Sequence, residues 1–492
     1  MGATLTVLLF TMAPMSPMPA SSTIAQGSGE VYVQAGEWPS IHHDAANSGV
    51  LPEPMAAPRQ FRLKWSALRN ASVLSSPVVG DDGRIYVTAT QEDFEPMEGW
   101  ESGILQSQLY ALDAETGEIV WTRNEVMLGG MAGAPLLIRS PRGELSIVAS
   151  GAGTVLAYDE NGKVRWRSNM GRREVSISAH LSPDGRSIFI GTDKGSVYLK
   201  DPATGNDLLP AYKDADFING NTPCMTMDGT VIMIGIRNGD EEDGVVCAVR
   251  PSVSSGTWDT IWTFEDIEGE SQTSPTLSQD GSRVYIGDEH SAIIALDAGS
   301  GEELWRYDFD ELTGNDYLAC ASLAVTSDGL LGIGLVHRSF QVDSRLIRFF
   351  SEYGFVLSRI MVGPCVSSFT DFVWGGAPRY AVILKDNGDR AEIVYMKDWK
   401  ITGGLTYSAG SGLFYFAGME EGTAGKLENI VVGLDSRTWE TYTQPIENAY
   451  FNNISLADGA LIVPIFWGGE MGTSIVTWEG FGLHYYEDAS SP

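Results

Sequence analysis

The chain is poor in cysteine and in long apolar runs. Its 492 residues hold 4 cysteines, none in a spacing that suits a metal site, and the first is Cys224. A bacterial lipid anchor requires a cysteine just after a signal segment, so we expect no such anchor. No internal run reaches the roughly 18 apolar residues that a membrane-spanning helix needs. These absences predict a soluble product without a membrane span.

Basic residues are also scarce. Lysine and arginine number 32 against 64 aspartates and glutamates, which gives a formal net charge of −32. Carboxylates are seldom buried in such numbers, so the surface is strongly negative. We therefore expect neither nucleic acid nor an anionic membrane as a partner. An acidic excess also suits a high-salt habitat, where screening relieves self-repulsion, and this explanation stays open.

No lysine or arginine precedes Arg59. A short apolar run from Ala3 to Met12 is followed by a stretch rich in proline, methionine and serine that reaches Ala25. We predict a signal peptide over residues 1–25 and a periplasmic or extracellular location. Because a signal peptide normally begins with basic residues, a mis-assigned start or a leader on an intracellular protein is the alternative. Residues 26–58 follow as a lead-in segment.

What the sequence does have is a repeat. The phrase Ala111–Trp121 recurs in almost the same form as Ala295–Trp305. In each phrase an apolar strand ends at an aspartate that bonds its own backbone, a glycine supplies the positive φ of the reversal, and a second strand follows. Each phrase therefore predicts a β-hairpin, and two further strands upstream complete a four-stranded sheet.

A second turn, between the first two strands, occurs once in each sheet, so the number of its copies gives the number of sheets. Most intervals between successive copies are about 42 to 60 residues, which is the length of a propeller blade. We therefore predict an all-β, eight-bladed β-propeller of four-stranded antiparallel blades over residues 59–487, with a tail at residues 488–492. The longer interval from Gly329 to Gly412 is either an insertion in this ring or a ninth repeat unit. The turn glycines are Gly83, Gly143, Gly185, Gly229, Gly281, Gly329, Gly412 and Gly459.

The two ends of the predicted propeller complement each other. Residues Phe61–Trp65 resemble the outer strand of the other repeats, and Ile454–Tyr486 supplies the last blade. Pairing these ends closes the ring with an N-terminal strand and hides exposed strand edges. We expect the closed ring to be a monomer.

The cysteines are expected to be spread over several blades. Cys224 and Cys247 are predicted on the first and third strands of one blade, roughly 9–10 Å apart, which is too far for a disulfide. Cys320 and Cys365 can pair only if both lie on the innermost strands of neighbouring blades. Buried free thiols are the alternative for this second pair.

The most conspicuous residues of the repeat have structural interpretations. The tryptophans are expected to fill the wedge between blades, and the aspartates to form turns. His180 is expected near the central channel, whereas His42 and His43 belong to a polar lead-in for which metal binding is the lesser alternative. We assign no catalytic, cofactor-binding or metal-binding residue. The residues assigned a structural role in the repeat are Asp113, Gly117, Trp121, Asp159, Trp166, Asp297, Gly301, Trp305, Asp435 and Trp439.

The Ala-x-Asp-x-x-(Thr/Ser)-Gly-x-x-x-Trp phrase resembles the repeat of PQQ-like β-propellers, and Trp38-Pro39 with His42-His43-Asp44 resembles their lead-in. One branch of this family, the quinoprotein dehydrogenases, holds pyrroloquinoline quinone and calcium in the central funnel, often above two adjacent cysteines. The present sequence has no such cysteine pair and no acidic and amide cluster that matches the calcium site. The other branch is similar to the scaffold subunit of the outer-membrane β-barrel assembly machinery.

The resemblance and the acidic surface together favour a non-catalytic binding platform. We predict a secreted or periplasmic propeller that holds protein partners through blade loops and edges and needs no cofactor. A dehydrogenase that oxidises alcohols or sugars with PQQ and calcium is the first alternative. A carbohydrate-active propeller, with paired carboxylates across the channel, is the second.

Overall fold

The computed structural model describes most of the chain from residue 27 to residue 488. The described part omits residues 69–70, 72, 74, 91–106, 125–132, 152, 171–173, 175, 193, 214–220, 238–243, 270, 272, 289, 314–316, 338–377, 402, 422–426, 447–452 and 466–481. The predicted signal peptide therefore lies outside the described residues, as does Cys365. Within this part the one helix is α1 (Asp310–Thr313), which is far too short to cross a membrane.

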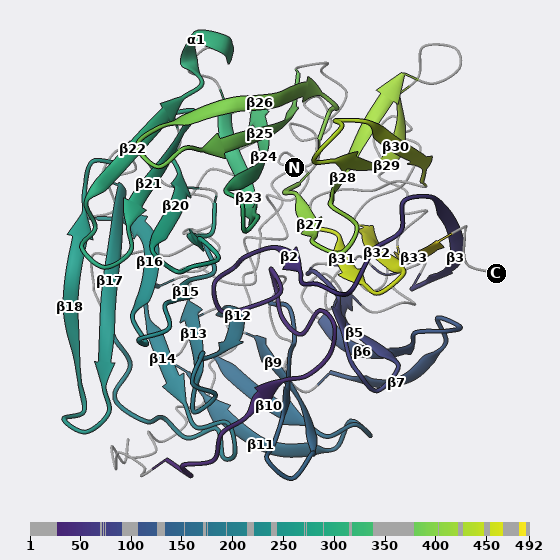
Figure 1. The fold of residues 1–492 in the computed structure, drawn as a ribbon. Helices are drawn as coiled ribbons and strands as arrows, with labels where there is room; N and C mark the ends of the chain where they lie inside the picture. Colours follow the sequence, from purple (N-terminus) through teal and green to yellow (C-terminus); the bar gives the residue numbers. More distant parts are fainter. Residues whose placement is uncertain are drawn as a thin grey trace, which may run out of the picture.

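Eight small antiparallel sheets stand around a common axis as the blades of a propeller (Figure 1). The predicted fold class and the number of blades are confirmed. In each blade the first strand lies nearest the axis. Blade 1 contains β4 (Val78–Val79), β5 (Arg84–Thr90), β6 (Ser107–Asp113) and β7 (Ile119–Arg123), and blade 2 contains β8 (Leu136–Arg139), β9 (Leu145–Gly151), β10 (Thr154–Tyr158) and β11 (Val164–Asn169). Blade 3 contains β12 (Ser176–Leu181), β13 (Ile188–Thr192) and β14 (Val197–Lys200). Blade 4 contains β15 (Cys224–Met225), β16 (Val231–Ile236), β17 (Gly244–Ser252) and β18 (Thr257–Phe264).

The second half of the chain forms the other four blades. Blade 5 contains β19 (Thr276–Leu277), β20 (Arg283–Gly287), β21 (Ala292–Asp297) and β22 (Glu303–Asp308), and blade 6 contains β23 (Tyr317–Val325), β24 (Leu330–His337), β25 (Tyr380–Asp386) and β26 (Ala391–Asp398). Blade 7 contains β27 (Thr406–Ser408), β28 (Leu413–Glu421), β29 (Leu427–Asp435) and β30 (Thr441–Pro445). Blade 8 contains β31 (Ser455–Ala457), β32 (Ala460–Ile465), β33 (Gly482–Asp488) and, from the N-terminal side, β3 (Phe61–Ala67).

Two details of the prediction are settled by these sheets. The long interval after Gly329 is an insertion within blade 6, because β24 pairs directly with β25 on its far side. In its described residues, blade 3 has three strands and not the expected four. The described chain that follows β14 meets it at two isolated bridges, Lys200 with Asp207 and Val197 with Tyr212, and Pro210 lies between them without an amide to donate.

The turns that count the blades have the backbone that the sequence predicts. All eight turn glycines, from Gly83 at φ 74° to Gly459 at φ 72°, adopt the left-handed conformation that side chains disfavour. The N-terminal strand β3 pairs antiparallel with β33, in a register that joins Phe61 to Asp488 and Ala67 to Leu483. The predicted ring closure is therefore confirmed.

The lead-in runs through the centre of the ring, where Figure 1 shows it in dark purple. It adds β1 (Val33–Gln34) to the inner edge of blade 2 and β2 (Val50–Leu51), in parallel, to the inner edge of blade 7. Its backbone also makes at least one hydrogen bond to every blade. In each of these bonds the N–H of the first residue donates to the carbonyl oxygen of the second, at 2.7–3.0 Å. In blade order the pairs are Val79 and Trp38, Leu137 and Pro39, Tyr32 and Gly185, Met225 and Ala45, Leu277 and Ala46, Val325 and Ser48, Tyr407 and Gly49, and Gly459 and Ala56.

The hydrophobic core lies between neighbouring blades. One cluster joins Val78 and Tyr86 of blade 1 to Leu137, Ile147 and Tyr158 of blade 2. The lead-in contributes fully or almost fully buried side chains to the same core, among them Trp38 and Leu51. The lead-in is therefore part of the folded ring, and it meets turns between first and second strands, as at Gly185 and Gly459.

Candidate functional site

The first candidate site is the ring axis, where the lead-in places His42. This imidazole is 6% exposed, and its Nδ1 accepts a hydrogen bond from the Ser322 hydroxyl at 2.6 Å. The Asn453 amide donates to the same hydroxyl at 2.5 Å and also lies 3.2 Å from His42 Nδ1. Burial, assisted by the nearby His180, lowers the pKa of His42 to about 3. The side chain is therefore neutral and joins the lead-in to blades 6 and 8.

His180, on β12 of blade 3, is a second neutral imidazole at the axis. Its Nδ1 lies 3.2 Å from the Ser40 hydroxyl, which itself donates to the carbonyl of His43 at 3.0 Å. Nδ1 is therefore the protonated nitrogen, and Nε2 keeps a lone pair that has no partner among the described residues. Burial lowers the pKa of His180 to about 4. The sequence placed this residue near the channel but did not suggest the serine.

Asp44 and Asn47 complete the lead-in's polar contacts. Burial alone would raise the pKa of Asp44, but hydrogen bonds from His43 and Ser48, with the charge of His43, hold that pKa below its usual range. The Asn47 amide donates to the carbonyls of Thr222 and Pro275, both at 2.9 Å, and so bridges blades 4 and 5. His42, His43 and Asn47 all adopt positive φ, between 53° and 79°. The axis residues thus serve to attach the lead-in to the ring.

The predicted turn aspartates lie in the hairpins between third and fourth strands. Asp113 accepts hydrogen bonds from the backbone of Glu115 and Thr116, and Asp297 accepts them from Gly299 and Ser300, all at 2.8–3.0 Å. Asp159 and Asp435 accept equivalent bonds in their own blades. Gly117 and Gly301 follow with φ near 73°. These residues shape the turns at the outer rim of one face.

The repeat tryptophans connect each blade to the next. The indole N–H of Trp121 donates to Glu160 O of blade 2, and that of Trp166 donates to Pro202 O of blade 3, both at 3.0 Å. Trp305 donates instead to a carboxylate oxygen of Asp386 in blade 6, at 3.1 Å. The Trp121 and Trp166 rings lie on the turn glycines of the next blade, Gly162 and Gly205. A Cβ added at Gly205 would fall 2.3 Å from the Trp166 ring.

Two tryptophans with the same role were missed, and one predicted tryptophan lies elsewhere. Trp65 and Trp262 donate to Ala114 O and Ala298 O, both at 3.0 Å, exactly as their position on an outer strand allows. Trp439 occupies the turn position that glycine has in other blades, with φ 60°, and stacks on Tyr395 at 5.8 Å. Its phrase is shorter by several residues, so the indole comes from the turn and not from the strand.

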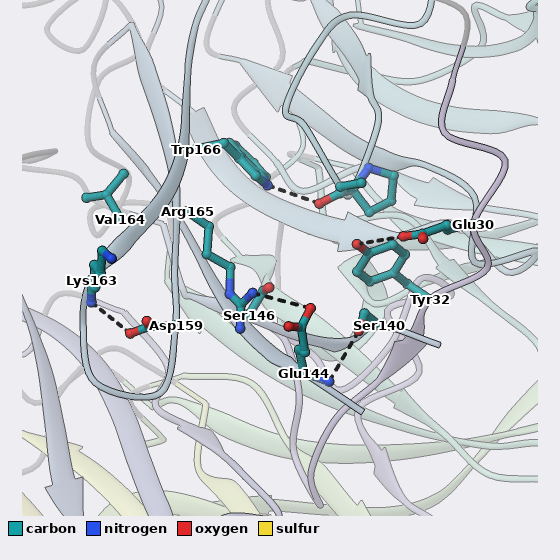
Figure 2. Close-up of a pocket in the computed structure, with 12 residues that line it drawn as sticks. Glu30, Tyr32, Ser140, Glu144, Ser146, Asp159, Lys163, Val164, Arg165 and Trp166 are labelled. Atoms are coloured by element: carbon teal, nitrogen blue, oxygen red, sulfur yellow. Dashed lines mark hydrogen bonds and ion pairs between the residues drawn. The ribbon is translucent and has the colours of Figure 1, made fainter. Parts of the chain in front are cut away.

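The second candidate site is a pocket of about 510 Å³ on the rim between blades 2 and 3. Three parts of the chain line it (Figure 2). They are the start of the lead-in, with Glu30 and Tyr32, the residues of blade 2, and the turn of blade 3 that holds Pro202 and Ala203. We name this pocket the rim groove. Its lining residues are Glu30, Tyr32, Ser140, Glu144, Ser146, Asp159, Lys163, Val164, Arg165, Trp166, Pro202 and Ala203.

Arg165 lies among carboxylates in the rim groove. It donates a hydrogen bond to Leu145 O at 3.1 Å, whereas its nitrogens lie 3.5 Å from Glu144 and 3.9 Å from Glu160. Glu30 in turn is 3.8 Å from Arg142, whose side chain is 79% exposed. These ion pairs are long and partly solvated, so each contributes little stability. Glu30 and Glu144 are therefore not held by short internal contacts as Asp44 is, whereas Asp159 accepts backbone hydrogen bonds in its own turn.

The cysteines and the other candidate ligands hold no metal in the described part. Cys224 and Cys247 are buried on β15 and β17 and form no disulfide with each other, as the spacing predicted. The proposed pairing of Cys320 with Cys365 falls outside the described residues. Among the residues that the structure describes, no group of three or more histidines, cysteines, aspartates and glutamates lies close enough to bind a metal ion.

Eight blades, tryptophan contacts between blades and a repeated Asp-Gly hairpin define a PQQ-like β-propeller. A family model described as outer membrane protein assembly factor BamB matches residues 60–233 and 242–334, and the chain belongs to this family. Protein Rv3035 of Mycobacterium tuberculosis is 22% identical over 336 residues, which are 63% of this chain and 74% of that protein.

Two solved structures illustrate the range of proteins with this fold. Quinohemoprotein alcohol dehydrogenase from Comamonas testosteroni superposes with a TM-score of 0.57 at 15% identity, over 94% of this chain and 82% of that one. BamB from Moraxella catarrhalis superposes with a TM-score of 0.51 at 13% identity, over 87% of this chain and 99% of that one. At these identities the likeness establishes the fold alone.

The described axis residues do not fit a quinone with calcium. Calcium takes six to eight oxygen ligands, usually with several carboxylates. His42, His180 and Asn47 are neutral, and the carboxylate of Asp44 already accepts hydrogen bonds from the Ser48 hydroxyl and from backbone amides. No catalytic step through such a cofactor follows from these residues.

Proposed function

We propose that this protein is a non-catalytic, extracytoplasmic platform that binds protein partners as a monomer. The observation that carries the proposal is the use of the axis. The polar side chains of the lead-in and of the inner strands bond to one another there, and the lead-in bonds to all eight blades. In this ring the axis is therefore a structural centre, and binding is left to the rim and the loops.

Two further facts support the proposal. The family description names an outer-membrane assembly factor, and a solved BamB has the same fold. The net charge of −32 also gives long-range attraction for basic proteins, which raises the rate of encounter. The family description supports a location outside the cytoplasm, and the charge supports basic protein partners.

The alternative with a specific observation in its favour is a PQQ-dependent dehydrogenase, because solved dehydrogenases share the fold. Calorimetry of the purified protein with PQQ and calcium chloride, followed by a dye-reduction assay with alcohols and sugars, separates the two. We expect neither saturable binding nor substrate-dependent reduction. Tight binding accompanied by dye reduction would make the protein an enzyme and refute the platform.

The platform itself is tested with a partner. The immobilised protein is used to isolate proteins from an extracytoplasmic extract of its own source, and each candidate is then purified and titrated against the free chain. We expect at least one saturable one-to-one complex. Failure of every purified candidate to bind would contradict the proposal.

A further inference from the structure

The rim groove has a polar group at its floor that the fold does not use. Ser146, on β9, is 5% exposed and lines the groove. Within the described part of the chain its hydroxyl has no hydrogen-bond partner, in contrast to the neighbouring Ser140, which accepts bonds from the backbone of Arg142 and Glu144 at 3.2 Å. A hydroxyl that faces a pocket and has no protein partner is a group to which a ligand can hydrogen-bond in place of water.

The charges around that hydroxyl are mainly negative. Figure 2 shows Tyr32 between Glu30 and Glu144, and Ser146 on the far side of Glu144, beside the Arg165 guanidinium. Glu144 is 53% and Glu30 35% exposed at the side chain, so both can accept new hydrogen bonds from a ligand. Burial, followed by the charges of Glu30 and Asp201, raises the pKa of the nearby Tyr32 to about 12. Together with Asp159, the two glutamates outnumber the cations that line the groove, Lys163 and Arg165, so the lining has a net negative charge that favours a cation.

The size of the groove suits more than one side chain. Its volume of about 510 Å³ lies within the range of about 300–1,000 Å³ that is usual for sites of drug-sized ligands. Val164, 37% exposed on the outer strand β11, adds an apolar edge at the opening. A short stretch of extended polypeptide with one inserted side chain fits these dimensions.

We propose that the rim groove is the docking site for an extended, lysine- or arginine-bearing segment of a protein partner. This inference rests on the proposed function and names the place on the platform where the partner binds. The inserted ammonium or guanidinium donates to Glu30 and Glu144, and the Ser146 hydroxyl accepts from it or bonds the partner's backbone. Arg165 remains held by Leu145 O and keeps Glu144 in place.

The test uses the full-length protein and a fluorescein-labelled peptide, Lys-Ser-Lys-Ser-Lys-Ser, with fluorescence anisotropy as the readout. The double variant Glu30→Gln with Glu144→Gln removes the two carboxylates that we assign to the cation. Its matched control is Glu118→Gln with Glu302→Gln, which removes the same charge from exposed hairpin positions in blades 1 and 5. A third variant, Ser146→Ala, removes the floor hydroxyl. Melting temperatures confirm that all four proteins are folded.

We expect the groove variant to bind the peptide at least tenfold more weakly than the control, and Ser146→Ala to bind it a few-fold more weakly. Equal loss in the groove and control variants would show attraction to the acidic surface at large and would overturn the site. No binding by the natural protein would also overturn it. If lysine amide competes as well as the peptide, the ligand is a small amine and the assignment to a protein segment is wrong.

The same variants separate this inference from the platform. A partner that binds the natural protein and the groove variant equally would sink the groove and leave the platform intact. If no partner binds the natural protein, the platform itself fails.

Discussion

The axis and the rim groove are both polar, but they differ in what their polar groups contact. At the axis, His42 Nδ1, the Asp44 carboxylate and the Asn47 amide nitrogen make short contacts to other parts of the same chain, whereas Asn47 Oδ1 and His180 Nε2 are buried without a partner among the described residues. In the groove, Arg165 and Glu30 have ion pairs of 3.5 Å or longer, and Ser146 has no described partner. Polarity alone therefore does not mark a binding site in this fold. The useful difference is that the groove carboxylates Glu30 and Glu144 are partly exposed and their ion pairs long, whereas the axis imidazoles and the Asn47 amide are buried.

The largest expected effect comes from removing an axis side chain. Trp38 is 1% exposed, packs edge-on against His43 at 5.2 Å and belongs to the core of the ring. Trp38→Ala should lower the free energy of unfolding by about 3–5 kcal/mol, the usual range for a buried tryptophan. Val164→Ala in the groove should lower it by less than about 1 kcal/mol. Urea denaturation of both variants checks the contrast, and equal losses would contradict it.

Acid should also weaken the axis before it affects the groove. The folded-state pKa values of His42 and His180, about 3 and about 4, lie below the ordinary value of 6.5, so the unfolded chain binds more protons between these limits. Stability is complete above pH 6.5 and falls as the pH drops toward 3. Between pH 6.5 and 4.5 each histidine should contribute a loss of about 2 kcal/mol.

Urea midpoints at pH 7.5 and 4.5 measure this loss. Asp288, whose pKa burial raises to about 6, acts in the opposite direction over part of the range, so Asp288→Asn is the appropriate background. In that background, His180→Asn should reduce the pH dependence, because one of the two buried imidazoles is gone. An unchanged pH dependence would contradict the assignment of neutral histidines.

Contacts between blades should have an intermediate effect. At Gly205, φ is 71° and a Cβ would meet the Trp166 ring at 2.3 Å, whereas at Gly229 φ is 86° and nothing lies within 4 Å. Gly229→Ala therefore tests backbone strain alone, about 1 kcal/mol. Gly205→Ala adds a clash with the indole and should destabilise by about 2–3 kcal/mol in total. Similar midpoints for the two variants in urea would show that the indole does not fasten blade 2 to blade 3.

The smallest effect on stability is expected in the groove. Glu30→Gln with Glu144→Gln removes partly solvated ion pairs, which typically contribute at most about 1 kcal/mol each. The melting temperature should change by less than about 3 °C, and added salt should not change the difference between variant and natural protein strongly. A large drop in melting temperature would mean that these carboxylates are structural, as those at the axis are.

The sequence predicts the ring well because its signals are local. A glycine with positive φ between two short strands is a property of a few neighbouring residues, and the eight copies counted the blades correctly. The insertion in blade 6 was left open because no turn marks its limits. Pro210, which interrupts the outer edge of blade 3, is visible in the sequence but was not given this role.

The site was much harder to predict because its contacts are distant in sequence. β1 and β2 have two residues each, too few for a strand pattern, although they fix the lead-in at the axis. Trp65 precedes the first full repeat, so its strand was predicted, but its contact with the turn of blade 1 is seen only once β3 is placed in the last blade. The rim groove joins Glu30 to Glu144 and Pro202, and nothing in the local sequence relates these residues.

Hydrogen–deuterium exchange of the full-length protein, with and without PQQ and calcium, tests the central claim most directly. If the axis is a structural centre, the blade amides that donate to lead-in carbonyls, those of Met225, Leu277, Val325 and Tyr407, exchange as slowly as the other amides of the blade strands, and the cofactor leaves them unchanged. Fast exchange of these four amides in the free protein, followed by protection when PQQ and calcium are added, would show that the axis is a ligand site and would contradict the account.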